Sequence, residues 1–275
     1  MLIRIGHTPN PDDAFMFWAL ASNKIDPRGF EFEPMAEELE TLNHWAWESR
    51  LEVTALSVYA YPFVQERYAL LPHGASMGTG YGPVVISHQP LSREQLREVE
   101  IVVPGATTTS FLVLRMCLGQ EFRYRVLPAN KILDEVKSGR AEAGLVNEES
   151  QLTYREEGLS KSVDIGEWWL LETGLPLPLT VNVARRDLGS RLPELSNVIR
   201  DSILAGLENR RRAMAYAMRY GRSSDVAITD RFVGMYVNEH SFDFGDEGRQ
   251  AIAELLGRAQ AIGAFDMPVK IEFVA

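Results

Sequence analysis

The apolar and polar positions at the start of the chain predict a strand, a short polar loop and a helix. Residues 2–5 alternate apolar side chains with a charged one, as a strand does, and residues 14–20 form an apolar run of helix-forming side chains. The loop at residues 8–13 lies between a strand end and a helix start, which is where open α/β sheets bind their ligands. Its carboxylates, Asp12 and Asp13, are therefore candidates for ligand contact, although each could simply cap the helix.

The same order of elements recurs in the middle of the chain. A strand at Glu100–Val103 leads into a loop of hydroxyl side chains and then into a helix at Phe111–Leu118. Hydroxyls at a helix N-terminus supply caps, and the free N–H groups beside them can bind an anion. One of the four hydroxyls at residues 107–110 is needed as a cap, and the others are candidates for ligand contacts.

A second pattern also occurs twice. Residues 48–57 and residues 137–148 each contain a helix end, a turn, a buried strand and a polar residue at the end of that strand. In the first copy this polar residue is Ser57. In the second copy the strand is followed by Asn147 and Glu148. These repeats predict two lobes of the same βαβ plan, with these polar side chains on facing rims.

The repeated units place the chain in the α/β class. Further strands are expected at residues 29–34, 51–56, 84–86 and 141–146, and further helices at residues 38–50, 130–139, 151–157, 195–220 and 245–261. The long helices at the end indicate that the chain returns to the first lobe. We therefore expect lobe one to comprise residues 1–87 and 183–275, and lobe two to comprise residues 88–182.

Composition and charge argue against several classes of function. The chain has 275 residues, of which 45% are hydrophobic and 24% charged, as in an ordinary globular protein. A net charge of −10 argues against nucleic acid or an anionic membrane surface as a partner. No apolar run reaches the ~18 residues that a membrane span needs. The first residues lack the basic and long apolar regions of a secretory signal, which predicts a cytoplasmic protein.

The sequence contains no common motif for a metal or a cofactor. There is no Cys/His spacing for zinc, no Gly-rich dinucleotide or Walker loop, and no Gly-x-Ser-x-Gly. The single cysteine, Cys117, lies in an apolar segment and is expected to be a buried, inert thiol. We therefore expect side chains alone to carry the chemistry, without a metal or an organic cofactor.

Seven segments, in order along nearly the whole chain, resemble the 1,4-dihydroxy-6-naphthoate synthases of the futalosine route to menaquinone. They are residues 6–20, 40–43, 54–57, 104–111, 144–154, 166–169 and 235–239. The resemblance implies a type II periplasmic-binding-protein fold, in which two α/β lobes joined by two crossing strands hold a ligand cleft between them. It also implies cleavage of cyclic dehypoxanthine futalosine to the naphthoate without a cofactor.

Matching the family's site residue by residue implies polar contacts to the substrate from Asn43, Ser57, Thr108 and Thr109. Asp13 also matches the family's first loop. Polar residues at the second lobe's strand end and in the last matching segment complete the set. The expected substrate contacts are therefore Asp13, Asn43, Ser57, Thr108, Thr109, Asn147 and Asn238.

The chain departs from the family pattern in two places. The first loop usually reads Pro-Cys-Pro-Asn-Asp-Thr-Phe in the family, and residues 9–15 here read Pro-Asn-Pro-Asp-Asp-Ala-Phe. The family's general base is a histidine in a Gly-x-x-x-His-Glu segment, and Glu148 stands at that position here. Glu148 is our candidate base, because burial or a neighbouring carboxylate such as Glu149 can raise a glutamate pKa by the ~2 units required. Capping of the next helix, altered chemistry and binding without turnover stay open, as does which of His7 and His240 faces the cleft.

We therefore expect an enzyme, a carbon–carbon lyase, that acts on a small-molecule carboxylate. Two alternatives stay open. One is a solute-binding protein of the same fold that holds a small carboxylate, and the other is a chorismate dehydratase of the same pathway. A monomer and a homodimer are both compatible with the sequence.

Overall fold

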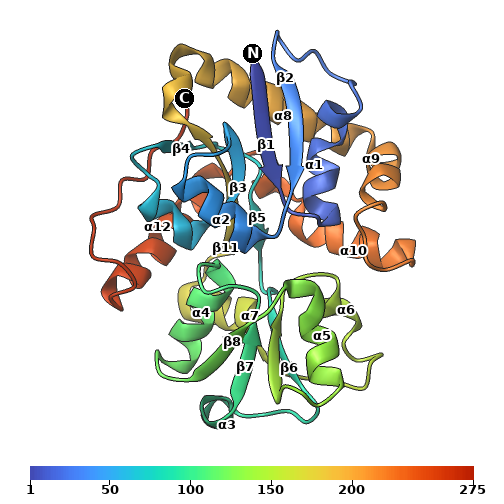
Figure 1. Ribbon diagram of the computed structural model, residues 1–275, viewed down its shortest axis with the longest axis vertical. Coiled ribbons are helices and arrows are strands. Elements are labelled where there is room, and N and C mark those ends of the chain that lie inside the picture. The colour runs from blue at the N-terminus through green and yellow to red at the C-terminus, as the bar shows by residue number, and fades with distance from the viewer.

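The computed structural model describes all residues from 1 to 275 and divides them between two α/β lobes (Figure 1). Each lobe is built on one β-sheet. The N-terminus and the C-terminus both lie in lobe one, at the top of the view. The α/β class and the two-lobed organisation expected from the sequence are confirmed.

The sheet of lobe one has the strand order β2-β1-β3-β11-β4, and β5 pairs with β11. Its strands are β1 (Leu2–His7), β2 (Glu31–Ala36), β3 (Val53–Ser57), β4 (Tyr68–Leu70), β5 (Ser76–Gly78) and β11 (Leu177–Arg185). Strand β1 is parallel to both β2 and β3. The C-terminal ends of these strands therefore share the sheet edge that faces lobe two (Figure 1).

The sheet of lobe two has the strand order β10-β6-β9-β7-β8. Its strands are β6 (Val84–Ser87), β7 (Glu100–Val103), β8 (Arg123–Val126), β9 (Ala143–Val146) and β10 (Ser160–Asp164). Strand β7 is parallel to both β8 and β9. The loops that carry Thr108 and Glu148 therefore leave this sheet at the same edge.

Helices pack around both sheets. Lobe one carries α1 (Pro11–Ala21), α2 (Leu39–Trp47), the 3₁₀ helices η1 (Val58–Phe63) and η2 (Arg186–Arg191), α8 (Leu192–Glu208), α9 (Arg210–Ala217), α10 (Val226–Tyr236), α11 (Glu239–Phe242) and α12 (Gly245–Ala261). Lobe two carries α3 (Arg93–Glu98), α4 (Thr109–Leu118), α5 (Ala129–Lys137), α6 (Ser150–Thr153) and α7 (Ile165–Thr173). Helix α1 is buried from Pro11 to Leu20 because α8, α9 and α10 pack against it, which explains why its sequence is apolar on all sides.

Two segments cross between the lobes. Residues 79–83 lead from β5 to β6, and residues 174–176 lead from α7 back to β11. The expected boundaries are wrong at both crossings. Strand β6 was expected in lobe one but pairs with β9 and β10 of lobe two, and residues 177–182 were expected in lobe two but belong to β11 of lobe one. Both strands are mainly apolar runs that either sheet could accept, so their distant pairing partners decide their place.

Several elements differ from the sequence expectation. The helix expected at residues 195–220 is divided into α8 and α9, because the backbone of Asn209 leaves the helical conformation at φ −116° and ψ 40°. Strands β8 and β10 were not predicted. They are the edge strands of their sheet and lack buried residues, so they carry little apolar pattern.

The largest apolar cluster, with 34 buried residues, runs through both lobes. It joins Leu112 of α4 to Leu56 and Val183 of the lobe-one sheet, and α4 packs against η1 and β11. Cys117 is buried in this cluster, as expected. Burial of this shared apolar surface holds the two lobes together beside the cleft. None of the helices has the length and apolar character required to cross a membrane, and the cytoplasmic location stays a prediction.

Candidate active site

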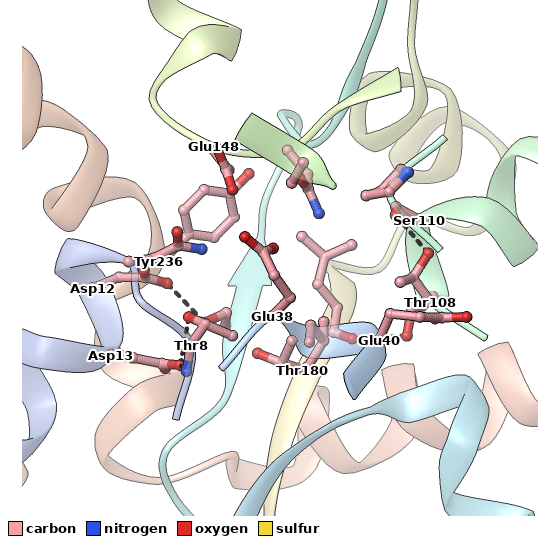
Figure 2. Close-up of a pocket in the computed structure, with 18 of the residues that line it drawn as sticks. Thr8, Asp12, Asp13, Glu38, Glu40, Thr108, Ser110, Glu148, Thr180 and Tyr236 are labelled. Carbon is pink, nitrogen blue, oxygen red and sulfur yellow. Dashed lines mark hydrogen bonds between the residues drawn. The ribbon is translucent and has the colours of Figure 1, made fainter. Parts of the chain in front are cut away.

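A cleft between the lobes is lined by the loops that follow β1, β7 and β9 (Figure 2). It encloses about 720 Å³, part of which is open to solvent. Helices α2 and α10 and strands β5 and β11 complete its wall on the side of lobe one. No lysine, arginine or histidine lines the cleft. Its five carboxyl side chains are those of Asp12, Asp13, Glu38, Glu40 and Glu148.

The two adjacent aspartates at the start of α1 have different surroundings. Asp13, an expected substrate contact, accepts hydrogen bonds from the backbone N–H and the hydroxyl of Thr8, both at 2.7 Å. Asp12 accepts one hydrogen bond, from the hydroxyl of Ser76 at 3.2 Å, and its buried Oδ1 has no partner. Burial raises the pKa of both carboxyls and, with the charge of Asp13, brings the pKa of Asp12 to about 7. Asp13 therefore holds the loop in shape, and Asp12 has an oxygen free for a ligand.

Glu148 follows β9 and is 4% exposed. Its carboxylate contacts the guanidinium of Arg222, which lies in the loop between α9 and α10 of lobe one. Burial raises the pKa of Glu148 to about 8, although Arg222 acts in the opposite direction. The nearby charges of Glu38, Glu149 and Asp12 contribute to the increase. Glu148 thus has the buried environment that a glutamate base requires.

Glu149 connects lobe two to the same loop of lobe one. Its carboxylate accepts hydrogen bonds from the backbone N–H groups of Arg222 and Ser223 and from the hydroxyl of Thr229. These bonds hold the loop next to β9 and so place the guanidinium of Arg222 on Glu148. No side chain caps α6, so the proposed capping role of Glu148 is wrong.

Asn43 and Ser57 are fully buried and do not line the cleft. The Asn43 side chain donates to the hydroxyl of Ser57 at 2.9 Å and to the hydroxyl and carbonyl of Thr107 at 3.0 and 3.2 Å. It accepts a hydrogen bond from the backbone N–H of Ser57 at 2.9 Å. Their polar groups therefore join α2 and β3 to the β7–α4 loop instead of pointing to a ligand.

Thr108 and Thr109 line the cleft at the N-terminus of α4. The Thr108 hydroxyl caps the helix by accepting a hydrogen bond from the N–H of Phe111 at 3.3 Å. The Thr109 hydroxyl donates to the carbonyl of Leu179 in β11 at 2.7 Å. By helix geometry, the N–H groups of Thr109 and Ser110 have no acceptor within the helix. They can therefore bind an anionic group in the cleft.

The other expected residues divide between the cleft and the surrounding structure. Asn147 lines the cleft, and its buried Oδ1 has no partner. Asn238 does not line it, because its side chain caps α11 and donates to the carbonyl of Met77 at 3.0 Å. Neither His7 nor His240 lines the cleft, so neither stands in for the family's histidine there.

The sequence-based prediction missed Glu38, Tyr236 and Arg222. Tyr236 is 2% exposed, lines the cleft and donates from its hydroxyl to Gln151 Oε1 at 3.0 Å. A helical assignment through residues 226–236 would have put Tyr236 on one face with Phe232, four residues earlier, which also lines the cleft. No feature of the sequence near Arg222 indicates that it reaches Glu148, because the contact depends on how the two lobes meet.

The two ends of the cleft differ in chemistry. Figure 2 shows Asp12, Tyr236 and Glu148 toward one end, and Thr108 and Ser110 toward the other. Carboxyls whose pKa lies near neutrality can move protons at physiological pH, and a helix N-terminus can hold an anion. One end of the cleft is therefore suited to proton transfer, and the other offers N–H groups that can hold an anionic group.

Solved structures show that other proteins share this fold. A protein from Archaeoglobus fulgidus is 38% identical and superposes with a TM-score of 0.91, covering 96% of this chain and 98% of that one. The ligand-binding component of an ABC-type import system from Staphylococcus aureus is 14% identical, with a TM-score of 0.72 over 100% of this chain and 96% of that one. The alkanesulfonate-binding protein of Xanthomonas axonopodis is 10% identical, with a TM-score of 0.71 over 98% and 95%. These likenesses confirm the expected periplasmic-binding-protein fold.

Sequence comparison identifies the family. Two relatives are each named 1,4-dihydroxy-6-naphtoate synthase. The one from Thermus thermophilus is 38% identical over 95% of both chains, and the one from Streptomyces coelicolor is 34% identical over 95% of this chain and 94% of that one. A family model described as menaquinone biosynthesis matches residues 3–261. Together with the cleft geometry, these matches show that the chain belongs to the menaquinone biosynthesis family.

Proposed function

We propose that this protein is a 1,4-dihydroxy-6-naphthoate synthase, a carbon–carbon lyase that cleaves cyclic dehypoxanthine futalosine to the naphthoate. Its family and its two relatives of that name support the assignment. The observation that carries it is the environment of Glu148. This buried carboxylate, with its raised pKa, lines the interlobe cleft at the position of the family's histidine base.

The substrate carboxylate binds at the N-terminus of α4 in this proposal. No cationic side chain lines the cleft, so backbone N–H groups must balance the negative charge. The N–H groups of Thr109 and Ser110 are free of helix acceptors, and the positive end of the helix dipole adds to their effect. Asn147 offers a further polar contact from lobe two.

Glu148 acts as the general base. It takes a proton from a substrate hydroxyl, or from a carbon beside a carbonyl, as the bond to the ring carbon breaks. Burial brings its pKa to about 8, into the range in which a base can work near neutral pH. Contact with Arg222 favours the ionised form and fixes the orientation of the carboxylate.

Incubation of the purified protein with cyclic dehypoxanthine futalosine, and separately with chorismate, tests the proposal. We expect naphthoate from the first compound and no product from chorismate. A dehydrated product from chorismate would indicate the dehydratase alternative. Binding of the futalosine, measured by calorimetry, without product would indicate the solute-binding alternative.

Glu148→Gln tests the base. We expect kcat to fall by about 10²-fold or more, with substrate Kd within about threefold, because the amide keeps the packing but cannot take up a proton. The matched control is Glu142→Gln, the same substitution at an exposed residue just before β9, which should leave kcat unchanged. An unchanged kcat in Glu148→Gln would remove Glu148 from the mechanism.

A further inference from the structure

Asp12 differs in its hydrogen bonding from the other carboxyls around the cleft. Its side chain is buried, its Oδ1 has no partner, and its Oδ2 accepts one hydrogen bond, at 3.2 Å, from a hydroxyl on β5. The carboxylates of Asp13 and Glu40 are occupied by N–H and hydroxyl donors. Glu148 and Glu38 both have the guanidinium of Arg222 beside them, in contact with Glu148 and at 3.7 Å from Glu38. Asp12 is therefore a buried carboxyl with a free oxygen and without a cation.

An ionised carboxyl in such a place is costly. A buried acceptor without a hydrogen-bond partner destabilises the fold, and more so when the group is charged. The titratable groups that face Asp12 increase this cost, because none is cationic: they are Asp13 on its own helix, Tyr236 on α10 and Glu148 on lobe two. Two states relieve the cost. Asp12 takes up a proton, or a ligand donates a hydrogen bond to it.

We propose, on the basis of the lyase function proposed above, that Asp12 is a second catalytic carboxyl and serves as the general acid opposite the base Glu148. The two side chains enter the same end of the cleft, Asp12 from lobe one and Glu148 from lobe two (Figure 2). A substrate held between the lobes therefore meets both. Contacts assign the roles, because the guanidinium of Arg222 lies against Glu148 and stabilises its ionised form, whereas no cation contacts Asp12, whose free oxygen can carry a proton to the substrate. The pKa of Glu148, about 8, lies above that of Asp12, about 7, so the reactive form, with Glu148 ionised and Asp12 protonated, is the less populated of the two singly protonated forms.

The step balances as two proton transfers around one bond cleavage. Glu148 removes the proton of a substrate hydroxyl, and the carbon that bears this hydroxyl becomes a carbonyl as its bond to the next carbon breaks. The electron pair of that bond goes to a carbon beside a second carbonyl and forms an enolate. Asp12 gives its proton to the enolate carbon. Exchange with water then removes the proton from Glu148 and returns one to Asp12.

Asp12→Asn tests the acid. We expect kcat at pH 7 to fall by about 10²-fold or more, with substrate Kd within about threefold. We also expect the variant to lose the alkaline limb of the kcat/KM pH profile, because that limb reports deprotonation of the acid. Asp12→Glu keeps a titratable carboxyl, so its pH profile should retain an alkaline limb, displaced to a different pH. If Asp12→Asn unfolds at or above the melting temperature of the wild type, its lower rate does not result from unfolding.

The outcomes separate this inference from the proposed function. A wild type that forms naphthoate, with Asp12→Asn within about threefold of its rate, would overturn the role of Asp12 and leave the proposed function standing. A slow Asp12→Asn that keeps the wild-type alkaline limb would also overturn it, since another group would then be the acid. A wild type that forms no naphthoate would overturn both. If Asp12→Asn does not fold, the kcat/KM pH profile of Asp12→Glu decides. An alkaline limb at the wild-type pH in that variant would overturn the role of Asp12 as the acid.

Discussion

Replacing Glu148 by glutamine should stabilise the fold at alkaline pH while it removes activity. Burial raises the pKa of this carboxyl from 4.5 to about 8 in the folded protein, so the unfolded chain ionises it more easily. A group with a raised folded pKa contributes its full stability below the unfolded pKa, and the contribution is lost as pH rises through the folded pKa. Wild-type stability should therefore decrease between pH 4.5 and about pH 8 through this one residue.

The magnitude follows from the two pKa values. Each pKa unit corresponds to about 1.36 kcal/mol, so the change from 4.5 to about 8 is worth on the order of 5 kcal/mol once the pH exceeds 8. The Glu148 side chain is only 6% exposed, so solvent screening reduces this little. The pKa of about 8 already includes the attraction between Glu148 and Arg222, so the loss of this ion pair is not subtracted again. We expect Glu148→Gln to gain on the order of 5 kcal/mol relative to the wild type at pH 9.

Urea unfolding of both proteins at pH 5 and pH 9 provides the measurement. At pH 5 their free energies of unfolding should agree within about 1 kcal/mol, because Glu148 is then protonated in the folded wild type. Glu142→Gln should match the wild type at both pH values, since Glu142 is exposed. Equal stability of wild type and Glu148→Gln at pH 9 would refute the argument that burial holds this carboxyl against ionisation.

Two other substitutions test the contacts around the cleft. Arg222→Gln should raise the pKa of Glu148 further, because a contacting positive charge is lost, and should lower kcat/KM at pH 7 about tenfold or more, with recovery at higher pH. A loss that is the same at every pH would show instead that Arg222 contacts the substrate. Asn43→Ala should lower the free energy of unfolding by about 1–3 kcal/mol, measured in urea, because it leaves the Ser57 N–H buried without an acceptor. A raised substrate Kd at unchanged stability would show that Asn43 binds the substrate.

The fold was predictable wherever one element leaves its own pattern in the sequence. The strand, loop and helix units at β1–α1 and β7–α4 repeat the same local order, and both were located within a few residues. The lobe boundaries were not predictable in this way. Strand β6 is an apolar run that its sequence alone does not assign to one sheet, and it lies in lobe two because β9 and β10, from much later in the chain, pair with it.

The site shows the same division between local and distant information. Thr108, Thr109, Asn147 and Glu148 directly follow strand ends or begin helices, and all four line the cleft. Asn43 also occurs in a segment that matches the family, but its polar atoms are already occupied by residues of β3 and of the opposite lobe. A sequence shows which groups can form hydrogen bonds. It does not show which of them the folded chain leaves free.

The two departures from the family pattern meet at one end of the cleft. By the resemblance described in the sequence analysis, Asp12 stands at the position of an asparagine and Glu148 at that of a histidine, and both residues line the cleft. A histidine works near neutral pH without help, and a lone glutamate does not. The charge of Asp12 contributes to the raised pKa of Glu148, about 8, and Asp12 itself has a pKa of about 7, so both carboxyls titrate near the range of a histidine. If Asp12 and Glu148 act together as proposed, Asp12→Asn, which gives the residue that the resemblance implies for the family, should impair this protein.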